Sequence, residues 1–355
     1  MIVIDGSHGE GGGQVLRTAL TLATVTGESI RIEHVRAGRK TPGLRPQHLT
    51  AVRAAAAVCG AHVEGDALGS QTLTFAPGDQ VSPGKYTFDV AQVAQRGSAG
   101  SVSLVLQTVL LPLALINGES HLTLRGGTHV PWAPPASYVE HVFLPLLRRM
   151  GIRARLDVVR WGFYPAGGGE MRVRINGRKG PLHPITLTDR GKLERVWGMA
   201  AVTNLPSHIP QRMANRARNV LMEADLSAQI EARRLQGAGP GAGIFLFTEY
   251  ASSSNGETSV AGFTAYGRKG LPSERVAEAA CEDLLTHHRS HTPVDPHLAD
   301  QLVLPIVLAK GESRLVTPRV SQHLLTNVWV VRQFLARNVI IEERPDTPAA
   351  LIVKE

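Results

Sequence analysis

The stretch "IVIDGSHGEGGGQVLRTALTLATVT", residues Ile2 to Thr26, places a strand signal, a glycine-rich loop and a helix signal in immediate succession. Ile2 to Ile4 is a run of β-branched residues, which favours a strand. Apolar residues then recur at helical spacing between Gln14 and Thr26. Because the glycines separate the two patterns, the segment predicts a strand and a helix joined by a tight loop.

Similar blocks of helices and strands follow along the chain. The first block is completed by an alanine-rich helix that Pro46 opens and Gly60 closes. The helices of the three blocks are expected at residues 14–26, 46–59, 102–115, 135–150, 298–309 and 322–337. Two glycine-rich segments, GEGGG from Gly9 and AGGGE from Ala166, support an internal repeat.

Between the second and third blocks, the order of elements changes to strand, basic helix, strand, glycine-rich break, two strands and a helix. We therefore expect an α/β protein of the α+β type. Three repeated units, each of two helices on a four-stranded sheet, would form a large domain from residues 1–184 and 286–355. A smaller α/β domain, residues 185–285, would be inserted before the third repeat.

The composition is that of an ordinary globular protein, with 43% hydrophobic and 19% charged residues among 355. The net charge of +8 and a pI of about 9.9 favour a polyanionic partner such as nucleic acid or nucleotide. No window approaches 18 uninterrupted apolar residues, so we expect no membrane span and no membrane partner. Cys59 and Cys281 form neither a CxxC pair nor a disulfide framework, which favours a reducing, cytoplasmic setting.

The loop DGSHGEGGGQVLR, Asp5 to Arg17, is the first candidate for chemistry. Glycines allow a close backbone approach, and the following helix offers unpaired N–H groups at the positive end of its dipole, so the loop suits an anion. Glu10 is a candidate ligand for a hard divalent cation. The same glycines also suit a tight turn without a ligand, and that alternative stays open.

A basic segment, RAGRKTPGLRPQHL from Arg36 to Leu49, is the second candidate. Forked guanidinium groups bind phosphate oxygens in pairs, so its closely spaced arginines suit a polyphosphate or an RNA end. Gln47 and His48 follow Pro46 at a helix start and are placed to face the same anion. A solvated basic loop is the alternative.

Four further residues are notable. Gln107 interrupts an apolar helix and needs a partner if buried, because an unmade hydrogen bond costs about 1–3 kcal/mol. Trp132, in the proline-rich loop GGTHVPWAPP, is available for packing or stacking. Asp300 lies in the first turn of a helix, where its charge complements the dipole. His323, in SQHLLTN, suits a structural role by itself, although a neutral imidazole is a competent nucleophile toward phosphorus.

Together these segments resemble the RNA 3'-terminal phosphate cyclases over essentially the whole chain. The matching segments, in the family's order, are DGSHGEGGGQVLRTAL, RAGRKTPGLRPQHLTAV, GSAGSVSLVLQTVL, GGTHVPWAPP, GFYPAGGG, LADQLVLP and SQHLLTN. The resemblance implies a three-repeat core with an inserted small domain, in agreement with the pattern of blocks. It also implies that ATP, with Mg²⁺ or Mn²⁺, converts an RNA 3'-phosphate to a 2',3'-cyclic phosphate, with histidine-AMP and RNA-adenylate intermediates and with AMP and pyrophosphate as products.

The resemblance further implies roles for single residues. The histidine of the last motif, here His323, becomes adenylylated, and the carboxylate of the glycine loop, here Glu10, is associated with the metal. The positions that match ATP-binding and phosphate-binding residues are Arg17, Arg36, Arg39, Gln47, Gln107, Pro131, His297, Leu298, Ala299, Asp300 and Gln301. Some members have tyrosine where this chain has His297, which leaves adenine stacking at that position open.

Other functions are weighed against this one. A non-catalytic branch of the family acts in ribosome assembly, but that branch lacks the histidine that this chain has at position 323. A nucleotidyltransferase with a lysine nucleophile would carry a KxDG motif, which does not occur in this chain. A side activity on DNA ends or 5'-phosphate ends stays open, and the sequence does not fix the oligomeric state.

Overall fold

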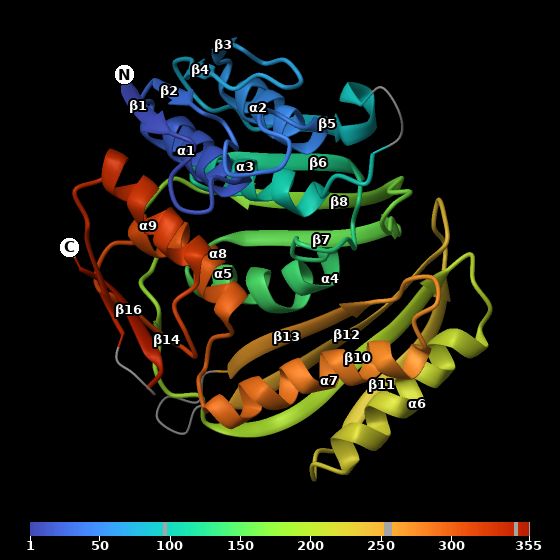
Figure 1. Ribbon diagram of the computed structural model, residues 1–355. Coiled ribbons are helices and arrows are strands. Elements are labelled where there is room, and N and C mark those ends of the chain that lie inside the picture. Colours follow the sequence, from blue (N-terminus) through green and yellow to red (C-terminus); the bar gives the residue numbers. More distant parts are fainter. Residues whose placement is uncertain (95–97, 252–257, 344–346, 355) are drawn as a thin grey trace.

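The computed structural model describes residues 1–94, 98–251, 258–343 and 347–354, so Gly97 at the start of the third family motif lies outside the described residues. The predicted fold class is confirmed, because the chain is a mixed α/β protein with helices packed on four-stranded sheets (Figure 1). Within the described ranges, no helix combines the length and the apolar character that crossing a membrane requires.

The first unit contains the strand, loop and helix predicted from the N-terminal sequence. Its sheet has the order β1 (Ile2–Asp5), β2 (Ile30–Glu33), β4 (Leu73–Ala76), β3 (His62–Glu64). Its helices are α1 (Gly13–Thr26) and α2 (Pro46–Cys59), and Gly27 and Gly60 end them in the left-handed conformation that glycine tolerates. Parallel pairing of β1 with β2 requires the crossover that α1 supplies.

The second unit repeats this plan. Its sheet has the order β5 (Lys85–Asp89), β6 (Gly118–Gly126), β8 (Gly169–Gly177), β7 (Arg153–Arg160). A short 3-10 helix, η1 (Val90–Val93), precedes helix α3 (Val102–Ala114), which is buried on nearly all sides. The helix predicted at 135–150 consists of α4 (Ala136–Tyr138), the π-helical turn η2 (Val139–Phe143) and α5 (Leu144–Arg149).

The third unit is formed mainly by the C-terminal part of the chain. Its sheet has the order β15 (Asn338–Glu342), β16 (Ala349–Lys354), β14 (Ser313–Thr317), β9 (Thr186–Leu187). Helices α8 (Pro296–Val307) and α9 (Gln322–Phe334) belong to it. Strand β9 precedes the small unit in sequence and pairs with β14, so the chain crosses the third sheet before it enters the small unit.

The small unit has its own sheet and its own hydrophobic cluster. The order is β11 (Ala228–Leu235), β10 (Lys192–Thr203), β12 (Gly241–Ala251), β13 (Thr258–Tyr266), with helices α6 (His208–Met222) and α7 (Ser273–Ser290) on one face (Figure 1). Arg212 and Arg216 of the basic helix bind Glu274 and Glu278 of α7. The division at residues 185 and 285 stays a prediction, and the elements of this unit run from Lys192 to Ser290.

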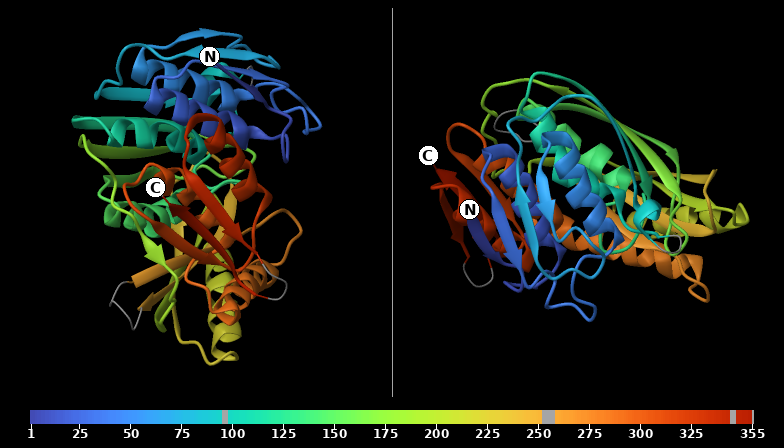
Figure 2. Two further views of the ribbon diagram at one scale, coloured as in Figure 1. Left: turned by 90° about the vertical axis from the view of Figure 1, so that its left-hand side faces the viewer. Right: turned by 90° about the horizontal axis from the view of Figure 1, so that it is seen from above.

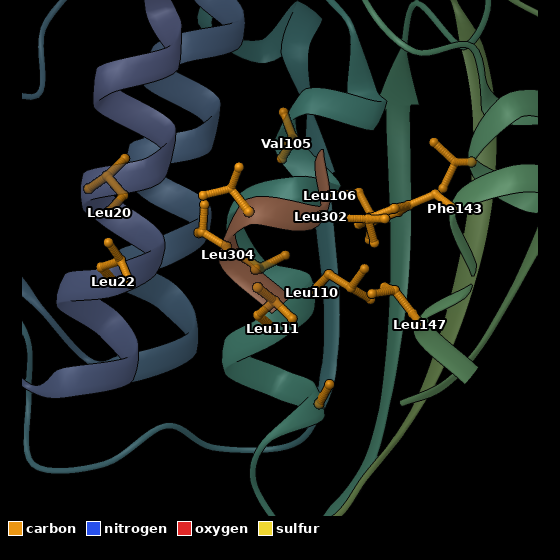
Figure 3. Close-up of a cluster of buried hydrophobic side chains, with 14 of the residues drawn as sticks. Leu20, Leu22, Val105, Leu106, Leu110, Leu111, Phe143, Leu147, Leu302 and Leu304 are labelled. Carbon is orange, nitrogen blue, oxygen red and sulfur yellow. The ribbon is translucent and has the colours of Figure 1, made fainter. Parts of the chain in front are cut away.

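Helices from all three repeats meet in one core. Leucine side chains of α1, α3 and α8 and Phe143 of η2 gather in a single cluster (Figure 3). Each such side chain contributes roughly 1.5–3 kcal/mol by leaving water. Helix α9 packs beside α1 although their contacting residues Gln14 and Asn327 are 313 positions apart (Figure 2). The ends of these helices therefore come together at one place on the molecule.

Candidate active site

The glycine loop before α1 lies directly against the basic loop before α2. The amide of Gly38 donates to the Gly11 carbonyl at 3.2 Å. A Cβ atom at Gly12 would lie 2.7 Å from Arg39 Nη2, and one at Gly13 would lie 2.5 Å from His48 Nε2. Glycine is therefore needed at both positions, because the basic side chains lie so close to the backbone that a Cβ atom would clash with them.

The N-terminus of α1 is open and surrounded by cations. Gly12 caps the helix without a side-chain hydrogen bond, and the first turn contains no acidic residue. Arg17 is buried and donates through Nη2 to Gln14 Oε1 at 2.7 Å, whereas its Nε has no partner among the residues that the structure describes. Burial, together with the charge of Arg39, lowers the pKa of Arg17 to about 10. An anion here would meet helix N–H groups and an uncompensated guanidinium.

His48 is a second buried group in this cluster. It is 5% exposed, and its Nδ1 accepts a hydrogen bond from the Arg45 amide at 3.3 Å. Burial, and then the charges of Arg36 and Arg17, hold the pKa of His48 well below its usual range. A neutral imidazole that accepts at Nδ1 carries its proton on Nε2, the atom that faces Gly13. His48 thus presents a neutral donor to the start of α1.

The basic loop uses its arginines in different ways. Nη1 of Arg36 donates to the carbonyls of Thr41 and Gly43, both at 2.8 Å, so this side chain also holds the loop in shape. Nη2 of Arg39 donates to Glu10 Oε2 at 2.7 Å. Gln47 accepts a hydrogen bond from the Ser101 amide at 2.9 Å and ties the loop to the start of α3.

His323 reaches the same cluster from the first turn of α9. Its Nδ1 lies 3.6 Å from Glu10 Oε2 and forms no hydrogen bond within the described part of the chain. Burial lowers the pKa of His323, the nearby charge of Glu10 opposes that shift, and Arg17 and Arg39 reinforce it. The imidazole is thus neutral near pH 7, and its side chain remains 42% exposed. Predicted residues from both ends of the chain therefore converge.

A buried polar network joins α1, α8 and α9. The carbonyl of Asp300 accepts from Asn327 Nδ2 at 2.9 Å, and Asn327 Oδ1 accepts from Gln14 and Thr18 at 2.8 and 2.6 Å. Ser321, the N-cap of α9, donates to the Asp300 carboxylate. Burial raises the pKa of Asp300 to about 7. These bonds fix the helix ends relative to one another.

The sequence did not assign roles to Gln14, Thr18, Ser321 and Asn327. Their only signal is that each is polar on or beside an apolar helix and lies within a quoted motif.

A cavity of about 50 Å³ lies between these helices, lined by residues that include Arg17, Gln107, Asp300 and Gln301. Gln107 Nε2 donates to Gln301 Oε1 at 3.0 Å, which supplies the partner that its position demands. Gln301 in turn donates to the carbonyl of His297 at 3.1 Å. The polar lining extends from the start of α1 to the start of α8.

The other predicted nucleotide contacts have different surroundings. His297 is exposed in the first turn of α8, whereas the side chains of Leu298 and Ala299 are fully buried in the core. Because the exposure of both whole residues is 0%, neither the side chains nor the backbone of Leu298 and Ala299 is open to a ligand in this structure. Pro131 lies in the loop between β6 and α4 and, within the described ranges, forms no hydrogen bond or ion pair with the cluster.

Glu10 offers limited donors to a metal ion. In the described part of the chain, no group of three or more His, Cys, Asp or Glu residues is arranged to hold one. One carboxylate next to a phosphate cradle nevertheless suits Mg²⁺ or Mn²⁺, since Mg²⁺ usually keeps several waters and binds one or two carboxylates plus substrate phosphates. Oε2 of Glu10 binds Arg39, which leaves Oε1 for a cation.

Comparison with known proteins adds an independent finding. A family model described as RNA 3'-terminal phosphate cyclase matches residues 8–341. A protein named RNA 3'-terminal phosphate cyclase from Nostoc punctiforme is 54% identical over 343 residues, covering 97% of each chain. Proteins of the same name from Methylococcus capsulatus and Archaeoglobus fulgidus are 54% and 40% identical, covering 95% and 96% of this chain and 92% and 98% of theirs.

Proposed function

The chain belongs to the RNA 3'-terminal phosphate cyclase family, and from this membership and the geometry of the site we propose that it uses ATP to cyclise RNA 3'-phosphate ends through an adenylylated His323. The observation that carries the proposal is the position of His323. A neutral imidazole lies beside Glu10 at 3.6 Å, next to a cluster of arginines and an open helix N-terminus.

In the first step, an imidazole nitrogen of His323 attacks the α-phosphorus of ATP, and the bond to pyrophosphate breaks. Glu10 lies on the Nδ1 side, which favours the proton on Nδ1 and leaves the Nε2 lone pair for attack. Arg17 and Arg39 neutralise negative charge on the departing pyrophosphate, which is the main task in transfer of this kind. The product is a histidine-AMP phosphoramidate.

In the second and third steps, AMP moves to the RNA 3'-phosphate and is then displaced by the adjacent 2'-hydroxyl. The oxygen of the RNA phosphate attacks the adenylate phosphorus and regenerates His323. The 2'-hydroxyl is already close to the activated phosphate, and such proximity can reach an effective molarity on the order of 10⁵ M. The need for this hydroxyl explains a preference for RNA over DNA.

We propose that Glu10 holds Mg²⁺ or Mn²⁺ together with nucleotide phosphates and water. Such a cation supplies charge neutralisation at the phosphates. The adenosine end of ATP is proposed to face Gln107, Pro131, His297, Asp300 and Gln301. Two free, buried cysteines support a cytoplasmic setting.

The proposal is tested by incubating the protein with α-labelled ATP and Mg²⁺. We expect acid-labile label on the protein, its loss in His323→Ala, and its retention in His62→Ala, a control histidine that is 77% exposed on β3. Equal labelling of His323→Ala would overturn the assignment of the nucleophile. An unlabelled wild-type protein that still binds RNA would instead favour a non-catalytic role.

A further inference from the structure

The loop between β6 and α4, residues 127–135, is held firmly at its base. The Gly127 amide donates to the Gly100 carbonyl at 2.9 Å, and the Gly127 carbonyl accepts from the Val102 amide at 3.0 Å. Ala136 donates to the Thr128 carbonyl at 2.9 Å, which brings the two ends of the loop together. Three of its residues are prolines, whose φ is fixed. The loop therefore presents whatever it carries in a defined position.

The loop exposes the side chain of Trp132 to solvent. The residue is 91% exposed, although tryptophan is highly buried on average. Its φ of 62° is an outlier for so bulky a residue. Within the described ranges, no other aromatic ring and no cation stacks on the indole. Exposure of one aromatic residue is common, but a bulky residue held in a strained backbone conformation is found most often at active sites and ligand sites.

The base of the loop lies between two walls of the proposed ATP site. On one side, Gly127 binds Gly100, whose neighbour Ser101 donates to Gln47 at 2.9 Å. On the other side, the loop continues into α4, where the Tyr138 hydroxyl donates to Asp295, the N-cap of α8, at 2.8–2.9 Å. The loop that carries Trp132 is thus tied at its base to residues on both sides of the proposed site.

A second exposed aromatic residue stands on a neighbouring segment. Tyr164 is 60% exposed, and its segment is bonded to the first loop through Gly162, which donates to Thr128 Oγ1 at 2.9 Å. Gly162 also accepts from the His129 amide at 3.1 Å. Arg160, just before it, is exposed, and nothing in the part of the chain that the structure covers pairs with its guanidinium. Two exposed aromatic rings therefore lie on loops that are bonded to each other, and Arg160, at the end of β7, lies just before the second loop.

We propose that Trp132, assisted by Tyr164 and Arg160, forms a stacking platform for the nucleobases at the 3' end of the RNA. This inference rests on the proposed function, because it concerns the acceptor strand of that reaction. Aromatic rings hold unpaired bases of any sequence, and a nearby arginine holds the backbone. The platform would grip the strand while the terminal phosphate enters the site.

The test measures equilibrium binding of a fluorescently labelled single-stranded RNA that ends in a 3'-phosphate, without ATP. Trp132→Ala should weaken binding about tenfold, as expected for loss of one base stack. Trp132→Phe should restore most of that loss, and Met222→Ala, a control residue 68% exposed on α6, should bind like the wild type. Normal binding by Trp132→Ala would overturn the inference.

A second RNA, with an abasic 3'-terminal residue, tests which base is held. The wild type should bind this abasic RNA less tightly than the RNA with an intact terminal base. Trp132→Ala should bind the two RNAs equally, because its stacking contact with the base is already absent. Additive losses would show that Trp132 does not contact this base.

Labelling of His323 by ATP should be unchanged in Trp132→Ala, and a raised KM for ATP would mean that Trp132 stacks on adenine instead. If RNA binds as expected and the wild type is never labelled, the proposed function fails while the platform stands.

Discussion

Helices α1 and α8 line the same cavity, but their N-termini are built in opposite ways. Helix α1 begins at Gly12 with no side-chain cap, and Arg17 lies one turn inside it. Helix α8 begins at Asp295, whose carboxylate accepts from the amides of His297 and Leu298, both at 3.0 Å. One end keeps unpaired N–H groups among cations, and the other is closed by a carboxylate.

This difference between the two helix ends predicts the orientation in which ATP binds. Phosphates are favoured at α1, where dipole, N–H groups and guanidinium charges act together. They are disfavoured at α8, where Asp295 satisfies the N–H groups and both Asp295 and Asp300 are buried carboxyl groups. We therefore expect the triphosphate to lie over α1 and the nucleoside toward α8, with His323 between them near Glu10.

The largest effect is expected from Arg17→Met. Loss of a charge aimed at the developing negative charge should lower the rate of His323 labelling by about 10² to 10³. Because Arg17 is buried without a carboxylate partner in the described part of the chain, the same change should raise the free energy of unfolding by about 1 kcal/mol. Labelling kinetics should show the lower rate, and chemical denaturation should show the higher free energy of unfolding. A parallel fall in stability and activity would show that Arg17 is structural.

Gly13→Ala should cost somewhat less, about 10 to 10² in labelling rate, because the new methyl would displace His48 and Arg17 by steric contact. The matched control is Gly27→Ala at the other end of α1, where an added Cβ meets nothing within 4 Å. Since Gly27 has a φ of 77°, its replacement should lower stability by about 1 kcal/mol with the labelling rate retained. Equal loss of labelling in both variants would contradict a phosphate cradle at α1.

At the α8 end, Tyr138→Phe removes the hydroxyl that donates to Asp295. Asp295 keeps its two backbone partners, so the helix should persist with a less firmly held cap. We expect the KM for ATP to rise by roughly three- to tenfold, corresponding to about 1 kcal/mol for one hydrogen bond, with little change in kcat. A fall in kcat with an unchanged KM would mean that α8 does not contribute to the binding of ATP in the ground state.

The remaining prediction concerns stability rather than catalysis, through its dependence on pH. The pKa of Asp300 is raised from 3.8 to about 7, so between these values the folded chain binds a proton that the unfolded chain has released. Its contribution to stability is full below pH 4 and is lost as the pH rises toward 7, with a slope of up to about 1.4 kcal/mol per pH unit. Asp300→Asn should remove this slope. Matching stability curves for the two proteins between pH 4 and 7 would rule out the shift.

Repeats and helices were predictable because they depend on local patterns. The periodicity of residues 14–26 and 46–59 agrees closely with α1 and α2, whereas the helix predicted at 322–337 begins as expected at Gln322 but ends three residues early, at Phe334. The single helix predicted at 135–150 has a π-helical turn in its middle, which no apolar spacing indicates.

The candidate site was predictable in its residues but not in its connections. Motif order brought His323 and Glu10 into one hypothesis, yet their 3.6 Å separation depends on α9 packing against α1. The use of Gln47 to hold Ser101, and of Arg36 to hold its own loop, could not be derived, because each depends on a backbone group placed by tertiary structure. Asp295 and Tyr138 were missed for the same reason.

The most direct test is a crystal structure with a non-hydrolysable ATP analogue whose α–β bridge is methylene. We expect the β- and γ-phosphates over the start of α1, bound by Arg17 and Arg39, with the α-phosphorus about 3–3.5 Å from an imidazole nitrogen of His323. A triphosphate bound at the start of α8, or an α-phosphorus out of reach of His323, would show that His323 is not the nucleophile in the way proposed.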